Sequence, residues 1–184
     1  MSGEWGPLAA LAGEWEGVEG FDTVFSRALG REIRTPYREH VTFTPFGPVA
    51  NGEQRVYGLD YRTEMWRGGE LLPFHAEVGY WLYDADTTEI LRAFVVPRGV
   101  TVLAGGHAEA SADAFTLRAD STDRDYTIGE SQFLTKRASS TTYRVAVRLH
   151  PDGAWSYDQV TTLRFAELAE PFAHTDRNTL RRAT

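Results

Sequence analysis

The sequence has 184 residues, of which 42% are hydrophobic and 24% are charged, so it can fold around a hydrophobic core. The formal net charge of -7 argues against a nucleic-acid-binding protein and equally against docking on anionic lipid. Cysteine is absent, which excludes disulfides, thiol catalysis and cysteine-ligated metal sites. No apolar run is long enough to span a bilayer, and no secretory signal opens the chain. We expect a cytoplasmic protein with one domain over residues 1–184.

One short helix is predicted near the start of the chain, over residues 7–12. Proline suits the first turn of a helix, alanine and leucine favour its interior, and Gly13 can supply the left-handed residue that ends it. Residues 21–34 and 120–136 fit neither a helix nor a strand pattern. We predict long loops there, each with room for a helical turn, that cover the ends of the fold.

The rest of the chain predicts strands, because runs rich in Val, Thr, Tyr, Phe and Trp alternate with Gly, Pro, Asn and Asp. The turn at residues 150–153 is a strong hairpin signal, since proline presets one turn dihedral and glycine tolerates a positive φ. The predicted strands cover residues 37–43, 55–66, 72–83, 89–96, 100–103, 141–149, 155–165 and about 172–182.

About nine or ten long strands are too many for a sandwich of this size, whereas closing the sheet removes its edges. We therefore predict an all-β fold, a single antiparallel up-and-down β-barrel of calycin type with about ten strands. A barrel of more than about eight strands leaves room for a ligand.

Several motifs, in order along the chain, resemble the nitrobindins, a family of haem-binding β-barrels related in shape to fatty-acid-binding proteins. Residues 11–17 (LAGEWEG) resemble the Gly-x-Trp-x-Gly entry strand of that family. Residues 37–43 (YREHVTF), 72–80 (LPFHAEVGY) and 97–100 (PRGV) resemble three later motifs. Residues 172–174 (FAH), followed by 180–182 (LRR), resemble the segment that supplies the proximal haem histidine. The resemblance spans nearly the whole chain and points to an uncharacterised bacterial branch.

This resemblance implies a haem b cofactor, bound as ferric haem, that reacts with nitric oxide or isomerises peroxynitrite. It implies that His174 is the proximal ligand, and hence the metal-binding residue, and that Phe74 and His75 line the distal side. Thr161 completes the expected cofactor-binding set. With no Cys and only Met1 and Met65 in the sequence, a haem iron would need a His or Tyr ligand.

The strand pattern separates the five histidines. His150 lies beside a turn, His107 follows two glycines, and His40 alternates with polar residues, so we expect all three on the outside. That leaves His75 and His174 on strands with apolar flanks.

Each of these two histidines also has a plain structural reading. His174 could be a ligand whose second ring nitrogen is held by Asp176 on the same strand face, or simply a buried histidine, with Asp176 capping a local turn. A two-residue metal site from this pair is a weaker reading. His75 shares a face with Glu77 and could be hydrogen-bonded to it. Strand alternation lets only one of Phe74 and His75 point inward, unless Pro73 introduces a bulge.

Two other functions stay open from the sequence. The barrel could carry a fatty acid or another hydrophobic ligand without haem, as lipocalin-like proteins do, with Arg92 or Arg144 as an internal anchor. It could also be a structural barrel filled by its aromatic residues. Trp15, Trp66, Trp81 and Trp155 are expected to pack in the barrel. No Gly-x-Ser-x-Gly motif or phosphate-binding glycine loop points to another chemistry.

Overall fold

Strands dominate residues 3–183, the part of the chain that this computed structural model of the protein describes. The elements in chain order are the 3-10 helix η1 (Gly3–Leu11), β1 (Gly13–Ser26), β2 (Arg31–Asn51), β3 (Gln54–Arg67), β4 (His75–Asp84), β5 (Glu89–Val96), β6 (Val100–His107), β7 (Ala114–Asp120), β8 (Ile128–Glu130), the helix α1 (Gln132–Thr135), β9 (Ala138–Leu149), β10 (Trp155–Phe165) and β11 (Phe172–Arg182).

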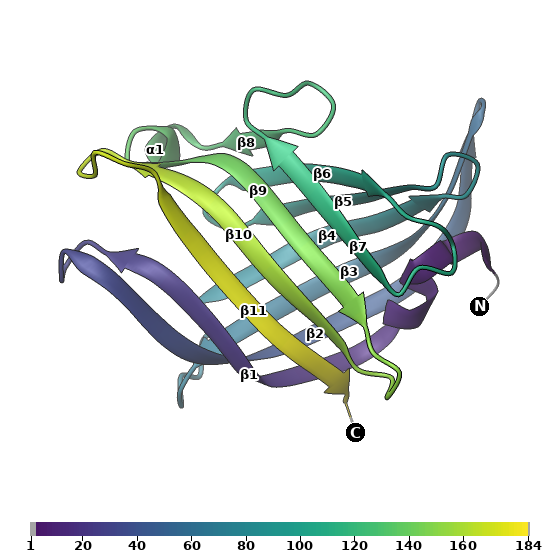
Figure 1. The fold of residues 1–184 in the computed structure, drawn as a ribbon, viewed down its shortest axis with the longest axis horizontal. Helices are drawn as coiled ribbons and strands as arrows, with labels where there is room; N and C mark the ends of the chain where they lie inside the picture. Colours follow the sequence, from purple (N-terminus) through teal and green to yellow (C-terminus); the bar gives the residue numbers. More distant parts are fainter. Residues whose placement is uncertain (1–2, 184) are drawn as a thin grey trace.

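Ten of these strands close into an antiparallel barrel, which confirms the predicted fold (Figure 1). Neighbours follow the order β5-β4-β3-β2-β1-β11-β10-β9-β7-β6, and β5 also pairs with β6, so the sheet returns on itself. The ring is weakest between β6 and β7, where Gly105 and Arg118 form the single registered pair. β8 pairs with the start of β6 and is the one strand outside the ring.

The predicted N-terminal helix is present as η1, and it closes one end of the barrel. Gly6 adopts φ 50°, which breaks the helix before Pro7. Leu8 and Leu11 are fully buried, and Trp5 Nε1 donates a hydrogen bond 3.2 Å long to the carbonyl of Gly58 on β3. The helix is therefore held against β3 and β4 as a plug.

The loop predicted over residues 21–34 is wrong, because most of it is strand. β1 and β2 stay paired from Phe21 and Pro36 out to Ser26 and Arg31, which leaves only residues 27–30 as a turn. The segment 120–136 does contain the expected helical turn, α1, but it also contains β8.

The half of the barrel next to η1 is a packed core, in which Trp15, Trp81 and Trp155 are buried as predicted. Trp15 and Trp155 meet edge to face, with ring centroids 6.3 Å apart. Trp66 differs from the prediction: it is half-buried, and the guanidinium of Arg38 lies 4.3 Å from its ring centroid. Within residues 3–183, the structure holds no helix long and apolar enough to cross a membrane.

Candidate functional site

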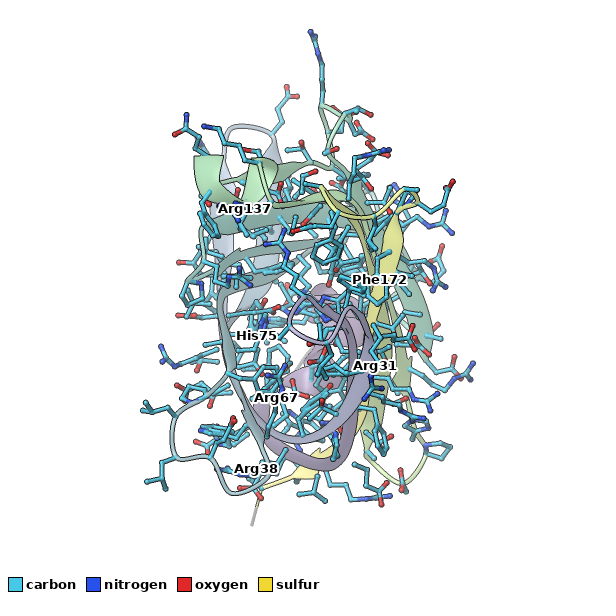
Figure 2. All side chains as sticks on the ribbon, turned by 90° about the vertical axis from the view of Figure 1, so that its left-hand side faces the viewer. Arg31, Arg38, Arg67, His75, Arg137 and Phe172 are labelled. Atoms are coloured by element: carbon cyan, nitrogen blue, oxygen red, sulfur yellow. The ribbon has the colours of Figure 1, made fainter. Side chains whose placement is uncertain are left out.

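A cavity of about 490 Å³ lies in the half of the barrel opposite η1. It opens at the end where α1 and the β1–β2 turn lie, and Figure 2 looks onto this end. Its outer part, which we call the rim, is lined mainly by the apolar side chains of Phe25, Val96, Val100, Phe133 and Phe165, with Arg27, Arg98 and Arg137 among them. Its inner part is polar, and we call it the floor: Asp22, Arg67, His75, Glu77, His174 and Asp176. The cavity thus suits a ligand with a broad apolar body and a polar or metal centre.

His174 reaches the cavity from β11 and is bonded to a residue that the sequence did not suggest. Its Nε2 lies 2.8 Å from Oδ1 of Asp22, and its side chain keeps 30% exposure. Because a carboxylate can only accept, Nε2 carries the proton of this bond. The expected partner Asp176 does line the cavity, but its Oδ2 accepts a hydrogen bond from Gln159 instead.

Asp22 is buried between His174 and Arg67. Nη2 of Arg67 lies 2.8 Å from its Oδ2, and Cζ of Arg67 lies 3.9 Å from the ring centroid of Phe74. Burial alone would raise the pKa of Asp22, but the hydrogen bond and charge of His174, followed by those of Arg67, hold it below its usual value. Asp22 is therefore an ionised carboxylate at the floor of the cavity.

His75 and Phe74 both line the cavity, so the choice that strand alternation imposed does not arise. β4 begins at His75, and Phe74 lies just before it, with its amide bonded 2.9 Å from the carbonyl of Met65. Alternation therefore applies only from His75 onward. On β4 the inward face carries Glu77 and Trp81, whereas Val78 and Tyr80, on the opposite face, are exposed.

His75 is hydrogen-bonded to Glu77, one of the two readings left open by the sequence. Nε2 of His75 lies 3.0 Å from Oε1 of Glu77, and Nη2 of Arg92 lies 2.5 Å from Oε2. Burial opposes ionisation of Glu77, yet the charge of Arg92 and then the bond from His75 lower its pKa to about 2. Burial lowers the pKa of His75, but the hydrogen bond and charge of Glu77 raise it overall.

Arg92 points into the barrel, whereas Arg144 is exposed on the outer wall. The guanidinium of Arg92 is already committed: besides Glu77, it donates to Gln159 Oε1 at 2.8 Å and to the hydroxyl of Tyr143. It is therefore not free to anchor a ligand carboxylate. His107 is exposed and His40 and His150 are half-buried, and none of the three lines the cavity.

Two further carboxyl groups lie in the interior without a cationic partner. Glu39 accepts hydrogen bonds from Thr63, Tyr157 and Asn178, yet burial raises its pKa to about 7. Burial also raises the pKa of Asp176 to about 6, although His174 and His75 oppose the shift. Asp176 Oδ1 and Arg67 Nε are buried without a hydrogen-bond partner in the described chain.

Thr161, the fourth expected cofactor-binding residue, lies on β10 directly opposite His174 and lines the same cavity. All four expected cofactor-binding residues, His174, His75, Phe74 and Thr161, therefore line one cavity. Asp22 and Arg67 were missed, because their role shows only when β1 and β3 are placed beside β11. In the described part of the chain, no three His, Cys, Asp or Glu side chains form a group that could hold a bare metal ion.

The residues present fit a haem. A mainly apolar rim lies outside an accessible imidazole, and two residues of the floor, Arg67 and Asp176, each have a buried polar atom without a hydrogen-bond partner. The bond from Nε2 to Asp22 leaves Nδ1 of His174 without a hydrogen-bond partner among residues 3–183. A ligating histidine usually gives its other ring nitrogen to a carboxylate in this way.

Comparison with known proteins agrees with this assignment. A family model described as a THAP4-like, heme-binding beta-barrel domain matches residues 4–182. The chain is similar to a solved crystal structure of Rv2717c from M. tuberculosis, with a TM-score of 0.65 and 20% sequence identity, over 97% of this chain and 98% of that chain. At that identity the likeness shows a shared fold. A search of curated protein sequences finds no match.

Proposed function

The chain belongs to the THAP4-like, haem-binding β-barrel family, and from this we propose that it binds ferric haem in the cavity with His174 as the axial ligand. The observation that carries the proposal is the position of His174, an accessible imidazole at the polar floor of a cavity whose rim is mainly apolar. Without cysteine the chain cannot attach haem through thioether bonds, which agrees with haem b as the proposed cofactor.

We further propose that the protein would act on nitric oxide or peroxynitrite, with His174 as the residue that would hold the haem. When bound, the haem supplies the redox and ligand-binding chemistry toward nitrogen oxides. The protein contributes an apolar rim that excludes water, and a phenyl ring, Phe74, that has no lone pair to offer the iron. Nε2 of His75 is hydrogen-bonded to Glu77, which fixes the orientation of its ring.

Hemin titration of the purified protein tests the ligand assignment. Wild type should develop a shifted Soret band, and His174→Ala should lose it while still unfolding cooperatively. His75→Ala is the matched control and should bind hemin with nearly unchanged affinity. An unaltered Soret band in His174→Ala, or none in wild type, would contradict the proposal. A six-coordinate spectrum that depends on His75 would contradict the proposal that no protein side chain other than His174 binds the iron.

The two other functions left open by the sequence, a fatty-acid carrier without haem and a structural barrel, have weaker support. An anchored fatty acid would have to displace Glu77 from Arg92, a buried contact of 2.5 Å. A structural barrel would be filled by its side chains, whereas this one keeps a cavity of about 490 Å³. Displacement of a fluorescent fatty acid by hemin would show whether both ligands use the same space.

A further inference from the structure

The ring of His174 is fixed by a buried carboxylate from a distant part of the chain. Asp22 is 2% exposed and lies 152 residues from His174, with its Oδ1 2.8 Å from Nε2. The strand register explains the contact. Asp22 is directly opposite Asp176 in the β1–β11 pair, and His174 is two residues from Asp176 on the same face.

Asp22 is itself held in place from the other side. Nη2 of Arg67, the last residue of β3, lies 2.8 Å from its Oδ2. The guanidinium of Arg67 is in turn fixed against the ring of Phe74, 3.9 Å away. A chain of contacts therefore runs from Phe74 through Arg67 and Asp22 to His174, across three separate parts of the sheet.

We propose that Asp22 is a positioning residue for His174, and that Arg67 limits the negative charge that Asp22 imparts to the imidazole. The proposal rests on the function proposed above, in which His174 is the haem ligand. Asp22 takes the proton-bearing nitrogen, so one ring tautomer is selected and the lone pair of the other nitrogen stays available. The charge of the carboxylate makes that lone pair a stronger donor, and the Arg67 cation reduces this effect.

Asp176, the partner that strand spacing suggested, does not fill this role. Its Oδ2 is bonded to Gln159 at 2.9 Å, and its Oδ1 has no partner among the described residues. It lies on the same face as His174, but its carboxylate is turned toward β10. Asp22 and Asp176 can therefore be told apart by substitution.

Nitrogen-15 NMR of the ligand-free protein tests the tautomer directly. At pH 9, well above the usual imidazole pKa of about 6.5, His174 should carry its proton on Nε2, its signal being assigned by its loss in His174→Ala. In Asp22→Asn the two tautomers should become mixed, while Asp176→Asn should leave the signal unchanged. A wild-type His174 with its proton on Nδ1 would overturn the proposal without any variant.

The hemin-loaded protein provides a second readout. Asp22→Asn should weaken hemin binding by about 10- to 100-fold, as loss of such a partner typically does. It should also lower the iron–histidine stretching frequency and raise the reduction potential, because the imidazole becomes a weaker donor. Arg67→Met should shift both quantities in the opposite direction. If the two substitutions only disturbed the structure, they would not be expected to shift the stretching frequency and the reduction potential in opposite directions.

Matched controls lie on the outer wall of the barrel. Asp158→Asn and Arg144→Met make the same chemical changes at exposed positions and should leave the frequency and the potential unchanged. Shifts of the same sign in Asp22→Asn and Arg67→Met, or none in either, would overturn the proposal. If wild type shows no Soret band, the proposed function fails, and the NMR measurement alone decides the role of Asp22.

Discussion

Replacing Arg92 with methionine tests how the barrel tolerates ionised groups in its interior. Arg92 and Glu77 are both buried, and their charged groups meet at 2.5 Å. The substitution preserves much of the side-chain volume but leaves Glu77 with hydrogen bonds only from Tyr61 and His75. Breaking a buried pair in this way typically costs about 3–5 kcal/mol.

The pKa of Glu77 gives a similar magnitude. Burial alone would raise that pKa, but Arg92 first and then His75 lower it from 4.5 to about 2. One pKa unit corresponds to about 1.4 kcal/mol, so the charged form of Glu77 gains about 3 kcal/mol on folding. Because the folded pKa is depressed, wild type has this stability above pH 4.5 and loses it as pH falls toward 2.

Guanidinium unfolding of the ligand-free protein, followed by tryptophan fluorescence at pH 7, measures the effect. Arg92→Met should lower the free energy of unfolding by about 3–5 kcal/mol. The double variant with Glu77→Gln should recover part of that loss, because it removes the unpaired charge. A loss below about 1 kcal/mol in Arg92→Met, or a double variant as unstable as the two single losses combined, would refute the reasoning.

Two further substitutions test the interior. Glu39→Gln should stabilise the protein at pH 8 but not at pH 4.5, because burial raises the pKa of Glu39 to about 7 and its contribution to stability is lost as pH rises through that value; an equal effect at both pH values in denaturant unfolding would contradict this. Gly79→Ala should destabilise by about 1–3 kcal/mol or more, since its Cβ would lie 2.0 Å from the carbonyl oxygen of Ala93. Gly69→Ala, in open space, should melt like wild type.

The barrel could be predicted from the sequence because the alternation of residues along each strand is a local pattern. Alternation places Glu39, Val41 and Phe43 on one face of β2. It places Tyr57, Leu59 and Tyr61 on one face of β3, and all six side chains are buried. The end of β1 failed for the opposite reason. Asp22 has a side chain typical of loops, and only the distant His174 and Arg67 make its burial on a strand favourable.

The residues of the candidate site could likewise be predicted only in part. His174, His75 and Phe74 were expected because the family resemblance marks short motifs. Thr161 lies outside those motifs, and the structure places all four residues along one cavity. Spacing alone favoured Asp176 as the partner of His174, since residues two apart share a strand face. A neighbouring strand supplied the partner instead: Asp22 lies opposite Asp176 and reaches His174 diagonally, a contact that spacing along one strand does not show.

Because η1 closes one end of the barrel, the cavity is open at the other end. Leu8 and Leu11 seal the far end over a packed core, so a ligand enters and leaves between α1 and the β1–β2 turn. A substitution at the rim, such as one at Phe133, then lowers or raises a single barrier that both directions share. Association and dissociation both change, and affinity changes with them where the substituted side chain contacts the bound ligand. How long a ligand resides thus depends on the rim as well as on the floor.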